Sequence, residues 1–251
     1  MAGTDRTQQP ADGGLAMILV KPQLGENIGA AARAMYNFGL TDMRLVQPRD
    51  GWPNPHAVGM ASGAMPVLDG ARVYQHAEDA AAEIQHLFAT TGRHRGMVKH
   101  VVTPRRAAEM MREAAARGER CGVLFGGERS GLDNDDVALA DNIICVPVNP
   151  AFASINLAQA VLLVAYEWFV AGDDTPPEEV ALGATRSANR EELVRLFEHL
   201  ESELDAHNFF RPPERRPGMV RSLRNMILRS RLTGQDVRTL RGIIGALASR
   251  R

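Results

Sequence analysis

The alternation of short apolar runs with segments of helical periodicity, between residues 17 and 170, most constrains the fold of this chain. Between the apolar runs, apolar residues recur three or four positions apart, as in Asn27–Phe38 and Pro104–Arg117. This alternation predicts an α/β fold in which a parallel sheet carries helices on both faces. The runs with the length and Val, Ile, Leu or Phe content of buried strands are Met17–Val20, Met43–Val46, His86–Thr90, Gly122–Phe125 and Ile143–Val148.

The sequence changes character after a nearly all-apolar helical run, Asn156–Val170, which is typical of a helix buried against a sheet or a partner subunit. Residues 171–185 contain AGDDTPPEE, which predicts a linker. Residues 186–251 show only helical periodicity, and Thr233 with Asp236 predicts an N-cap for the last helix. We therefore expect a flexible N-terminal tail over 1–16, an α/β domain over 17–170, a linker over 171–185 and a small all-α domain over 186–251.

Positive charge is concentrated near the C-terminus of a chain whose net charge is −1. Eleven arginines follow Phe209, and only Glu214 and Asp236 oppose them. This asymmetry favours a nucleic-acid partner over a merely solvated helix face. The arginines that we expect to contact RNA are Arg211, Arg215, Arg216, Arg221, Arg224, Arg229 and Arg231.

Several classes of protein are disfavoured. No run of about 18 apolar residues is present to span a membrane, and the polar N-terminus lacks the apolar core of a secretory signal. Cys121 and Cys145 lie far apart in strand-like runs, which predicts buried, reduced thiols and a cytoplasmic location. The seven histidines show no metal-ligand spacing, so we expect no metal site.

Three stretches combine glycine, polar side chains and turn residues at the ends of predicted strands, where open α/β sheets bind ligands. They are GENIGAAAR from Gly25 to Arg33, FGGERSGL from Phe125 to Leu132, and VPVNPAFASINL from Val146 to Leu157. Structural alternatives stay open for each: a surface salt bridge for the arginine, a plain turn for the second stretch, and a helix cap for the third. Adjacent glycines in the second stretch would allow backbone geometry that other residues cannot adopt.

In this order and spacing, the three stretches resemble the three motifs of the SPOUT superfamily of RNA methyltransferases, and most closely those of the TrmJ-type tRNA 2′-O-methyltransferases in its TrmH branch. The similarity covers Met17 to Phe169, and RSLRNMILRSRLTGQDVRTLRGII resembles the helical extension of TrmJ-type enzymes. The resemblance implies a C-terminal trefoil knot in the α/β domain and a homodimer. It also implies S-adenosylmethionine as the cofactor and methyl transfer to a ribose 2′-hydroxyl, at position 32 of the tRNA anticodon loop.

The resemblance also assigns catalytic and cofactor-binding positions to individual residues of this chain. The polar positions of the family's catalytic site fall on Asn27, Arg33, Glu128, Ser154 and Asn156. The cofactor loops fall on Thr90, Thr91, Gly92, Gly126, Val146, Ala153, Ser154, Ile155 and Leu157. The arginine of the first motif is proposed as the base in this family, but a guanidinium group stays protonated at neutral pH and is therefore a poor base. Alternatively, this arginine would contact a phosphate and position the hydroxyl.

Three other functions remain open at this point. The first is the same 2′-O-methyl transfer to rRNA, and the second is a non-catalytic RNA-binding protein on a SPOUT scaffold. The third, a nucleotide-binding oxidoreductase, is disfavoured because no GxGxxG fingerprint is present. The sequence does not decide between cytidine and uridine as the target base.

Overall fold

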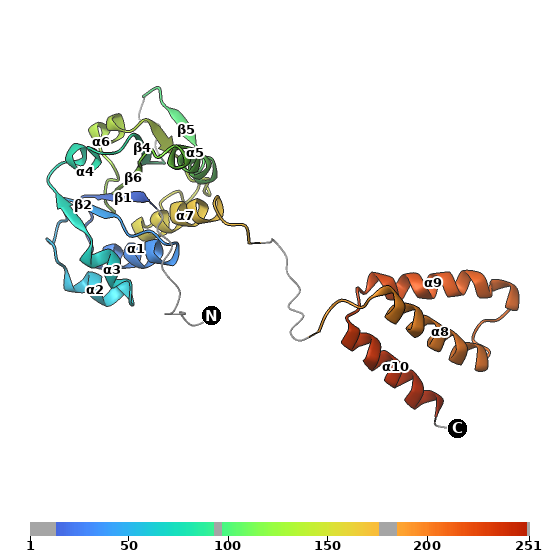
Figure 1. Cartoon of the computed structure of the whole chain (residues 1–251). Helices are drawn as coiled ribbons and strands as arrows, with labels where there is room; N and C mark the ends of the chain where they lie inside the picture. Colours follow the sequence, from blue (N-terminus) through green and yellow to red (C-terminus); the bar gives the residue numbers. More distant parts are fainter. Residues whose placement is uncertain (1–13, 93–96, 176–184, 250–251) are drawn as a thin grey trace. The chain divides into compact units, whose positions relative to one another are not determined.

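The computed structural model of the chain describes residues 14–92, 97–175 and 185–249 (Figure 1). These residues form two compact units, divided between Thr175 and Pro176. Residues 1–13 of the predicted tail and 176–184 of the predicted linker lie outside the described residues. In the part of the chain that is described, no helix is long and apolar enough to cross a membrane.

The first unit is built on a sheet of seven strands in the order β3-β2-β1-β6-β4-β7-β5. Every neighbouring pair is parallel, which confirms the predicted parallel α/β class. The strands are β1 (Leu15–Val20), β2 (Met43–Val46), β3 (Arg72–Tyr74), β4 (His86–Thr90), β5 (His100–Val102), β6 (Cys121–Gly126) and β7 (Asn142–Ile144). The predicted trefoil knot stays a prediction.

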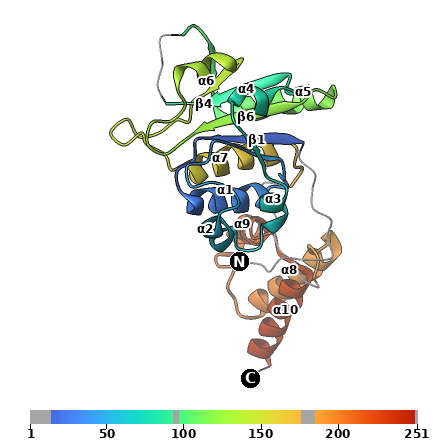
Figure 2. The ribbon, with the colours of Figure 1, turned by 90° about the vertical axis from the view of Figure 1, so that its left-hand side faces the viewer.

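Helices cover both faces of this sheet because alternate residues of each strand point to opposite sides. On β1, Leu15, Met17 and Leu19 belong to one apolar core, whereas Ile18 and Val20 belong to the other. The first core is completed by α1 (Gly25–Asn37), α2 (Pro55–Ala61), α3 (Met65–Asp69), α5 (Pro104–Ala116) and α7 (Leu157–Val170). The second is completed by α4 (Ala77–Ala81) and α6 (Asn134–Leu139). Figures 1 and 2 show α1 and α7 on one side of β1, with α4 and α6 on the other.

Two strands and four short helices were not predicted from the sequence. β3 and β5 lie at the two edges of the sheet and are largely exposed, so they have no continuous apolar run. The helices α2, α3, α4 and α6 have five to seven residues, too few to establish a helical period. In contrast, the strand predicted over Ile143–Val148 was too long, because β7 ends at Ile144 and the following residues leave the sheet.

The second unit contains only helices: α8 (Arg190–Ala206), the 3₁₀ turn η1 (Pro213–Arg215), α9 (Arg216–Arg229) and α10 (Gly234–Ala248). The predicted cap of the last helix is confirmed. Thr233 Oγ1 accepts a hydrogen bond from the Asp236 N–H at 3.2 Å, and Asp236 Oδ2 accepts one from the Thr233 N–H at 2.8 Å. The core of this unit is small, and α9 contributes no buried residue to it.

Candidate active site

All nine residues that the resemblance assigned to the cofactor line one cavity of about 360 Å³ at the carboxyl ends of β4, β6 and β7. Thr90 ends β4 and is followed by Thr91 and Gly92, and Gly126 ends β6. The others come from the loop between β7 and α7 and from Leu157, the first residue of α7. Hydrogen bonds fix the first of these loops against its neighbours: Thr90 Oγ1 donates to the Leu124 carbonyl at 2.9 Å, and the Thr91 N–H donates to the Ile144 carbonyl at 3.2 Å. The structure thus brings together residues from three separate stretches of sequence.

The adjacent glycines Gly126 and Gly127 are required by space. A Cβ atom on Gly126 would overlap the backbone of Gly131 and Leu132, and one on Gly127 would overlap the carbonyl oxygen of Lys21. The loop folds back on itself here, since the Gly131 N–H donates to the Gly127 carbonyl at 2.9 Å. Neither glycine of the pair has a positive φ, although Gly131 does at 68°. The unusual backbone geometry expected of the pair is therefore absent, and close approach of chain segments explains both residues.

Glu128 connects the loop after β6 to the start of α1. Its Oε2 accepts a hydrogen bond from the Gln23 N–H at 2.8 Å, and its Oε1 accepts from the Leu24 N–H at 3.2 Å and from Asn27 Nδ2 at 2.7 Å. Asn27 Oδ1 in turn accepts from Asn156 Nδ2 at 3.0 Å. Three of the five predicted catalytic residues thus form one hydrogen-bonded chain across the three motifs.

These contacts determine the charge of Glu128. Partial burial by itself would raise the pKa of its carboxyl group, but the hydrogen bonds from Asn27 and from the backbone of Gln23 and Leu24 outweigh burial and lower the pKa. The group is therefore a carboxylate at neutral pH, with its lone pairs directed at donors of its own chain. Sequence reasoning missed the two backbone donors, because an N–H group leaves no signature in the residue types.

Asn156 also caps α7. Its Oδ1 accepts hydrogen bonds from the Ala158 N–H at 2.9 Å and from the Gln159 N–H at 3.4 Å. The structural alternative of a helix cap is therefore correct for this residue, and its amide nitrogen contacts Asn27 as well. Ser154, the other candidate for the cap, instead lines the cavity.

Arg33 stands apart from this chain of contacts. Its side chain is exposed on α1, it does not line the cavity, and within the described residues it makes no hydrogen bond or ion pair. It follows Asn27 by six residues, so at 100° per residue the two side chains point about 120° apart around the helix. The surface salt bridge that was the alternative for Arg33 is not present among the described residues.

The small residues of the first motif serve the packing of α1. A Cβ atom on Gly29 would overlap the carbonyl group of Ala57 in α2, and one on Gly25 would lie 2.7 Å from Cγ of Asn54. The two helices approach closely because these glycines carry no side chain. This packing fixes α1, and with it Asn27, beside the loop that carries Glu128.

The two cysteines differ in exposure. Cys121 is buried at the start of β6, and burial, assisted by the nearby charge of Glu119, raises the pKa of its thiol to about 11. Cys145 is only half-buried, which differs from the prediction. Both thiols are free. Among the described residues, no three His, Cys, Asp or Glu side chains are grouped to hold a metal ion.

The arginines expected to contact RNA divide into two groups. Arg216 makes two hydrogen bonds to Asp205, at 2.9 and 2.5 Å, and Arg224 makes two to Glu201, at 2.6 and 2.9 Å. These ion pairs join α9 to α8. The others are exposed and unpaired within the described part of the chain: Arg211, Arg215, Arg221, Arg229 and Arg231.

The chain is similar to known proteins along most of its length. The model described as the SpoU rRNA Methylase family matches residues 14–166, and that of the tRNA methyltransferase TrmJ, C-terminal domain, matches residues 191–251. The tRNA (cytidine/uridine/adenosine-2′-O-)-methyltransferase TrmJ of Pseudomonas aeruginosa is 34% identical over 238 residues, which cover 92% of each chain. The tRNA (cytidine/uridine-2′-O-)-methyltransferase TrmJ of Klebsiella pneumoniae is 32% identical and covers 93% of this chain and 96% of its own.

A solved structure agrees with these matches. The crystal structure of TrmJ from Z. mobilis ZM4 superposes with a TM-score of 0.80 at 50% identity and covers 93% of this chain and 99% of that chain. The comparisons confirm the resemblance inferred from the three motifs and the C-terminal run, and they give no support to the oxidoreductase alternative.

Proposed function

Because this chain belongs to the SpoU rRNA methylase family and matches the TrmJ C-terminal domain along its helical unit, we propose that it transfers a methyl group from S-adenosylmethionine to a ribose 2′-hydroxyl of tRNA. The observation that carries the proposal is that the three motifs converge at the strand ends. One cavity lies there, and hydrogen bonds link Glu128, Asn27 and Asn156 beside it. Such an enzyme would act in the cytoplasm on the anticodon stem-loop, with position 32 as its target.

The cavity fits S-adenosylmethionine by size and chemistry. Ligand sites of this kind have apolar walls and a few polar groups that orient the ligand. Ile144, Ile155 and Leu157 offer apolar walls for a purine ring, and the Ser154 hydroxyl offers a polar contact. When bound, S-adenosylmethionine supplies an electrophilic methyl group, so the residues of the chain need only bind and orient the two reactants.

The chain's own residues must then assist a ribose hydroxyl that loses its proton on methylation, although it is a very weak acid. Glu128 is a poor base, since its pKa is lowered and its oxygens already accept three hydrogen bonds. We assign it, with Asn27, to holding the start of α1 against the cavity. Arg33, exposed and unpaired within the described residues, would bind the phosphate and the hydroxyl oxygen of the target nucleotide. Ser154 would orient the ribose from the cavity wall. Correct placement of the hydroxyl beside the methyl donor would lower the barrier, and the hydroxyl proton would pass to solvent as the methyl group is transferred.

A homodimer is part of the proposal. One side of α7 packs on the sheet, as predicted for an all-apolar helix, but the other side leaves large apolar side chains in the open. These are Leu162, Leu163, Tyr166 and Val170, each 36–48% exposed. An exposed apolar surface on one helix is typical of a site that a second protein surface covers. A second copy of this chain would cover it through a two-fold interface.

The test is methyl transfer by purified protein. The protein is incubated with S-adenosylmethionine and unmodified total tRNA, and new 2′-O-methyl groups are mapped by mass spectrometry. A single new methyl group at position 32 is the expected result, and a methyl group elsewhere would overturn the target while keeping the reaction. Binding of S-adenosylmethionine without transfer to tRNA would favour rRNA as the substrate or, if rRNA is also inert, a non-catalytic RNA-binding role.

A further inference from the structure

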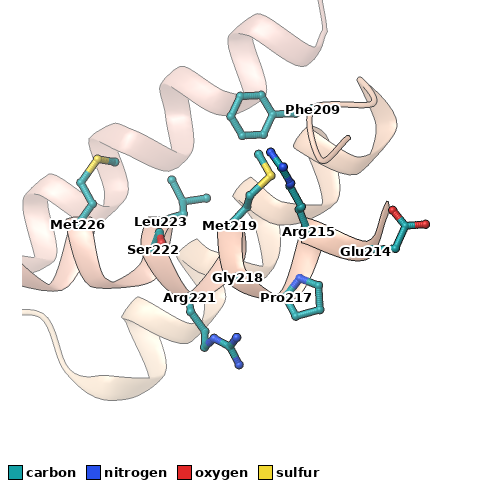
Figure 3. A pocket seen from close by; sticks show the side chains of 10 residues that line it. All are labelled: Phe209, Glu214, Arg215, Pro217, Gly218, Met219, Arg221, Ser222, Leu223 and Met226. Carbon is teal, nitrogen blue, oxygen red and sulfur yellow. The ribbon is translucent and has the colours of Figure 1, made fainter. Parts of the chain in front are cut away.

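The helical unit contains a hollow of about 720 Å³ that none of the three motifs explains (Figure 3). It is formed by the residues after α8, by η1 and by the first three turns of α9. Its volume is in the range of small-molecule and nucleotide sites. Most of its lining is carbon, from Phe209, Met219, Leu223 and Met226.

The lining side chains gather on one side of α9. Arg215, Met219, Leu223 and Met226 follow one another at three or four residues, which places them in a stripe along the helix. Figure 3 shows these four on the same side as the ring of Phe209, with Arg215 beside Met219 below the ring. Since α9 buries no residue within the described part of its unit, this stripe is open to a partner.

The ring of Phe209 is held in place by the end of α8. The helix ends with Asn208 in the left-handed region at φ 52°, and the Phe209 N–H donates to the Leu204 carbonyl at 2.9 Å. The Asn208 N–H donates to the Asp205 carbonyl at 3.0 Å, which completes a Schellman termination. The buried ring of Phe210 supports Phe209 edge-on, with centroids 5.4 Å apart. Phe209 itself remains 54% exposed, so an aromatic surface is available at a fixed position.

The charges around the hollow are those of an anion-binding surface. Arg215 and Arg221 line it and have no hydrogen-bond or ion-pair partner among the described residues. Figure 3 shows Arg215 beside the ring of Phe209, whereas Arg221 points away from that ring. The neighbouring Arg216 is already paired with Asp205 and lies outside the lining. Glu214, the acidic residue of the lining, points away from Phe209 in Figure 3. An apolar hollow with unpaired arginines suits a nucleotide better than an uncharged protein surface.

We propose that this hollow binds one unstacked nucleotide of the RNA substrate, with its base against Phe209 and a neighbouring phosphate at Arg215. The inference rests on the proposed function, since it assumes that RNA is the substrate. Single-stranded nucleotides are recognised by stacking on aromatic side chains beside a positively charged surface, and stacking does not depend on the identity of the base. The helical unit would thus recognise an unpaired nucleotide in a loop, in addition to the charge of the backbone.

The test measures the affinity of the full chain for an unmodified tRNA transcript at several salt concentrations. Phe209→Leu keeps an apolar side chain but removes the ring, and we expect it to weaken binding about fivefold or more. The slope of log affinity against log salt should not change, because no counterion contact is lost. Phe209→Trp should keep the affinity of the unaltered chain. Arg215→Ala should weaken binding and also reduce the slope by about one.

Two controls lie outside the hollow. Leu247→Ala removes an apolar side chain that is 67% exposed on α10, and Arg195→Ala removes an exposed arginine that pairs with Glu191 on α8. Both should leave affinity and salt slope close to those of the unaltered chain. The melting temperature and the oligomeric state of every variant are measured without RNA.

Each outcome decides the inference. If the unaltered chain methylates tRNA and Phe209→Leu binds tRNA as tightly as the unaltered chain, the inference is wrong and the proposed function stands. If Phe209→Leu changes the oligomeric state without RNA, a second copy of the chain covers the hollow, and the inference is again wrong. If the unaltered chain neither binds nor methylates tRNA, the proposed function fails and the inference falls with it. Loss of affinity in Phe209→Leu with retention in Phe209→Trp supports a stacked base.

Discussion

Replacement of Glu128 by Gln tests whether a charged group holds the three motifs together. In the folded chain, Oε2 of Glu128 accepts one hydrogen bond and Oε1 accepts two, all from fixed donors. A glutamine has one oxygen and one NH₂ group, so its nitrogen must face either the Gln23 N–H or the donors of Leu24 and Asn27. At least one donor therefore loses its acceptor, and the remaining hydrogen bonds lose the assistance of a negative charge.

The size of the effect follows from these contacts. A hydrogen bond to a charged group contributes about 1.5–3 kcal/mol to stability when buried. Glu128 is only partly buried, so water compensates some of the loss, and we expect a decrease in the free energy of unfolding of about 1–2 kcal/mol. At an m-value of about 2 kcal/mol/M, the urea midpoint should fall by roughly 0.5–1 M.

The effect should depend on pH in a defined direction. The pKa of Glu128 is lower in the folded chain than the value of about 4.3 expected in an unfolded one. Its contribution to stability is therefore present above pH ~4.3 and is lost as the pH falls through the folded pKa. A glutamine does not titrate. The difference in stability between the two proteins should thus be full at pH 7 and shrink as the pH falls below about 4.

Urea unfolding followed by tryptophan fluorescence measures this difference in the relevant unit, because both tryptophans, Trp52 and Trp168, lie in the α/β unit. Glu109→Gln is the matched control, since Glu109 is exposed and pairs only with Arg106 on its own helix. An exposed pair of this kind contributes about 0–1 kcal/mol. Equal midpoints for Glu128→Gln and the unaltered chain at pH 7, or a deficit at pH 3 as large as that at pH 7, would refute the reasoning.

Three further predictions concern the cavity, the reaction and the thiols. Gly126→Ala places a methyl group on the backbone of the returning loop, so it should lower stability by about 1–3 kcal/mol and abolish the rise in melting temperature with S-adenosylmethionine. Gly92→Ala should fold as stably as the unaltered chain, because among the described residues no atom lies within 4 Å of its new Cβ. Arg33→Lys should slow methyl transfer about a hundredfold with cofactor binding unchanged, because an ammonium group cannot contact hydroxyl and phosphate in the same geometry; near-full activity would disprove the assignment. The buried thiol of Cys121, with a pKa of about 11, should react with iodoacetamide at pH 8 only in unfolded protein. Mass spectrometry detects the label, and fast labelling of Cys121 in the folded chain would contradict its burial.

The part of the fold that the sequence predicts is the part that is buried on both sides. β1 is buried at every position and β6 at all but its last, and each therefore reads as a continuous apolar run. β3 at the sheet edge has the residues Arg-Val-Tyr, none of them buried, and carries no such signal. The short helices escape for a different reason: five to seven residues are too few to establish a helical period, even where most of them are buried, as in α4.

The candidate site was found for a related reason. Parallel strands bring their carboxyl ends to one edge, so stretches that follow them must meet there, even when they are as far apart in sequence as Asn27 and Asn156, which are separated by 129 residues. What periodicity could not supply was the pattern of contacts. Glu128 meets Asn27 and two backbone N–H groups, and only the path of the loop before α1 decides that. The role of Gly126 was likewise misjudged, because overlap with Leu132 depends on a loop that returns to the strand.

The basic helical unit shows that the number of charges in a sequence differs from the number available to a partner. Glu201 and Asp205 lie one turn apart on α8, and each binds an arginine of α9 with two hydrogen bonds. Glu201 is nearly buried, so its partner Arg224 cannot move to a phosphate without leaving a carboxylate unpaired. Those two arginines stabilise the helix pair. Of the exposed arginines that remain, Arg215 and Arg221 line an apolar surface that α9 does not bury. Affinity for RNA in this unit should therefore depend on contacts with bases as well as on charge.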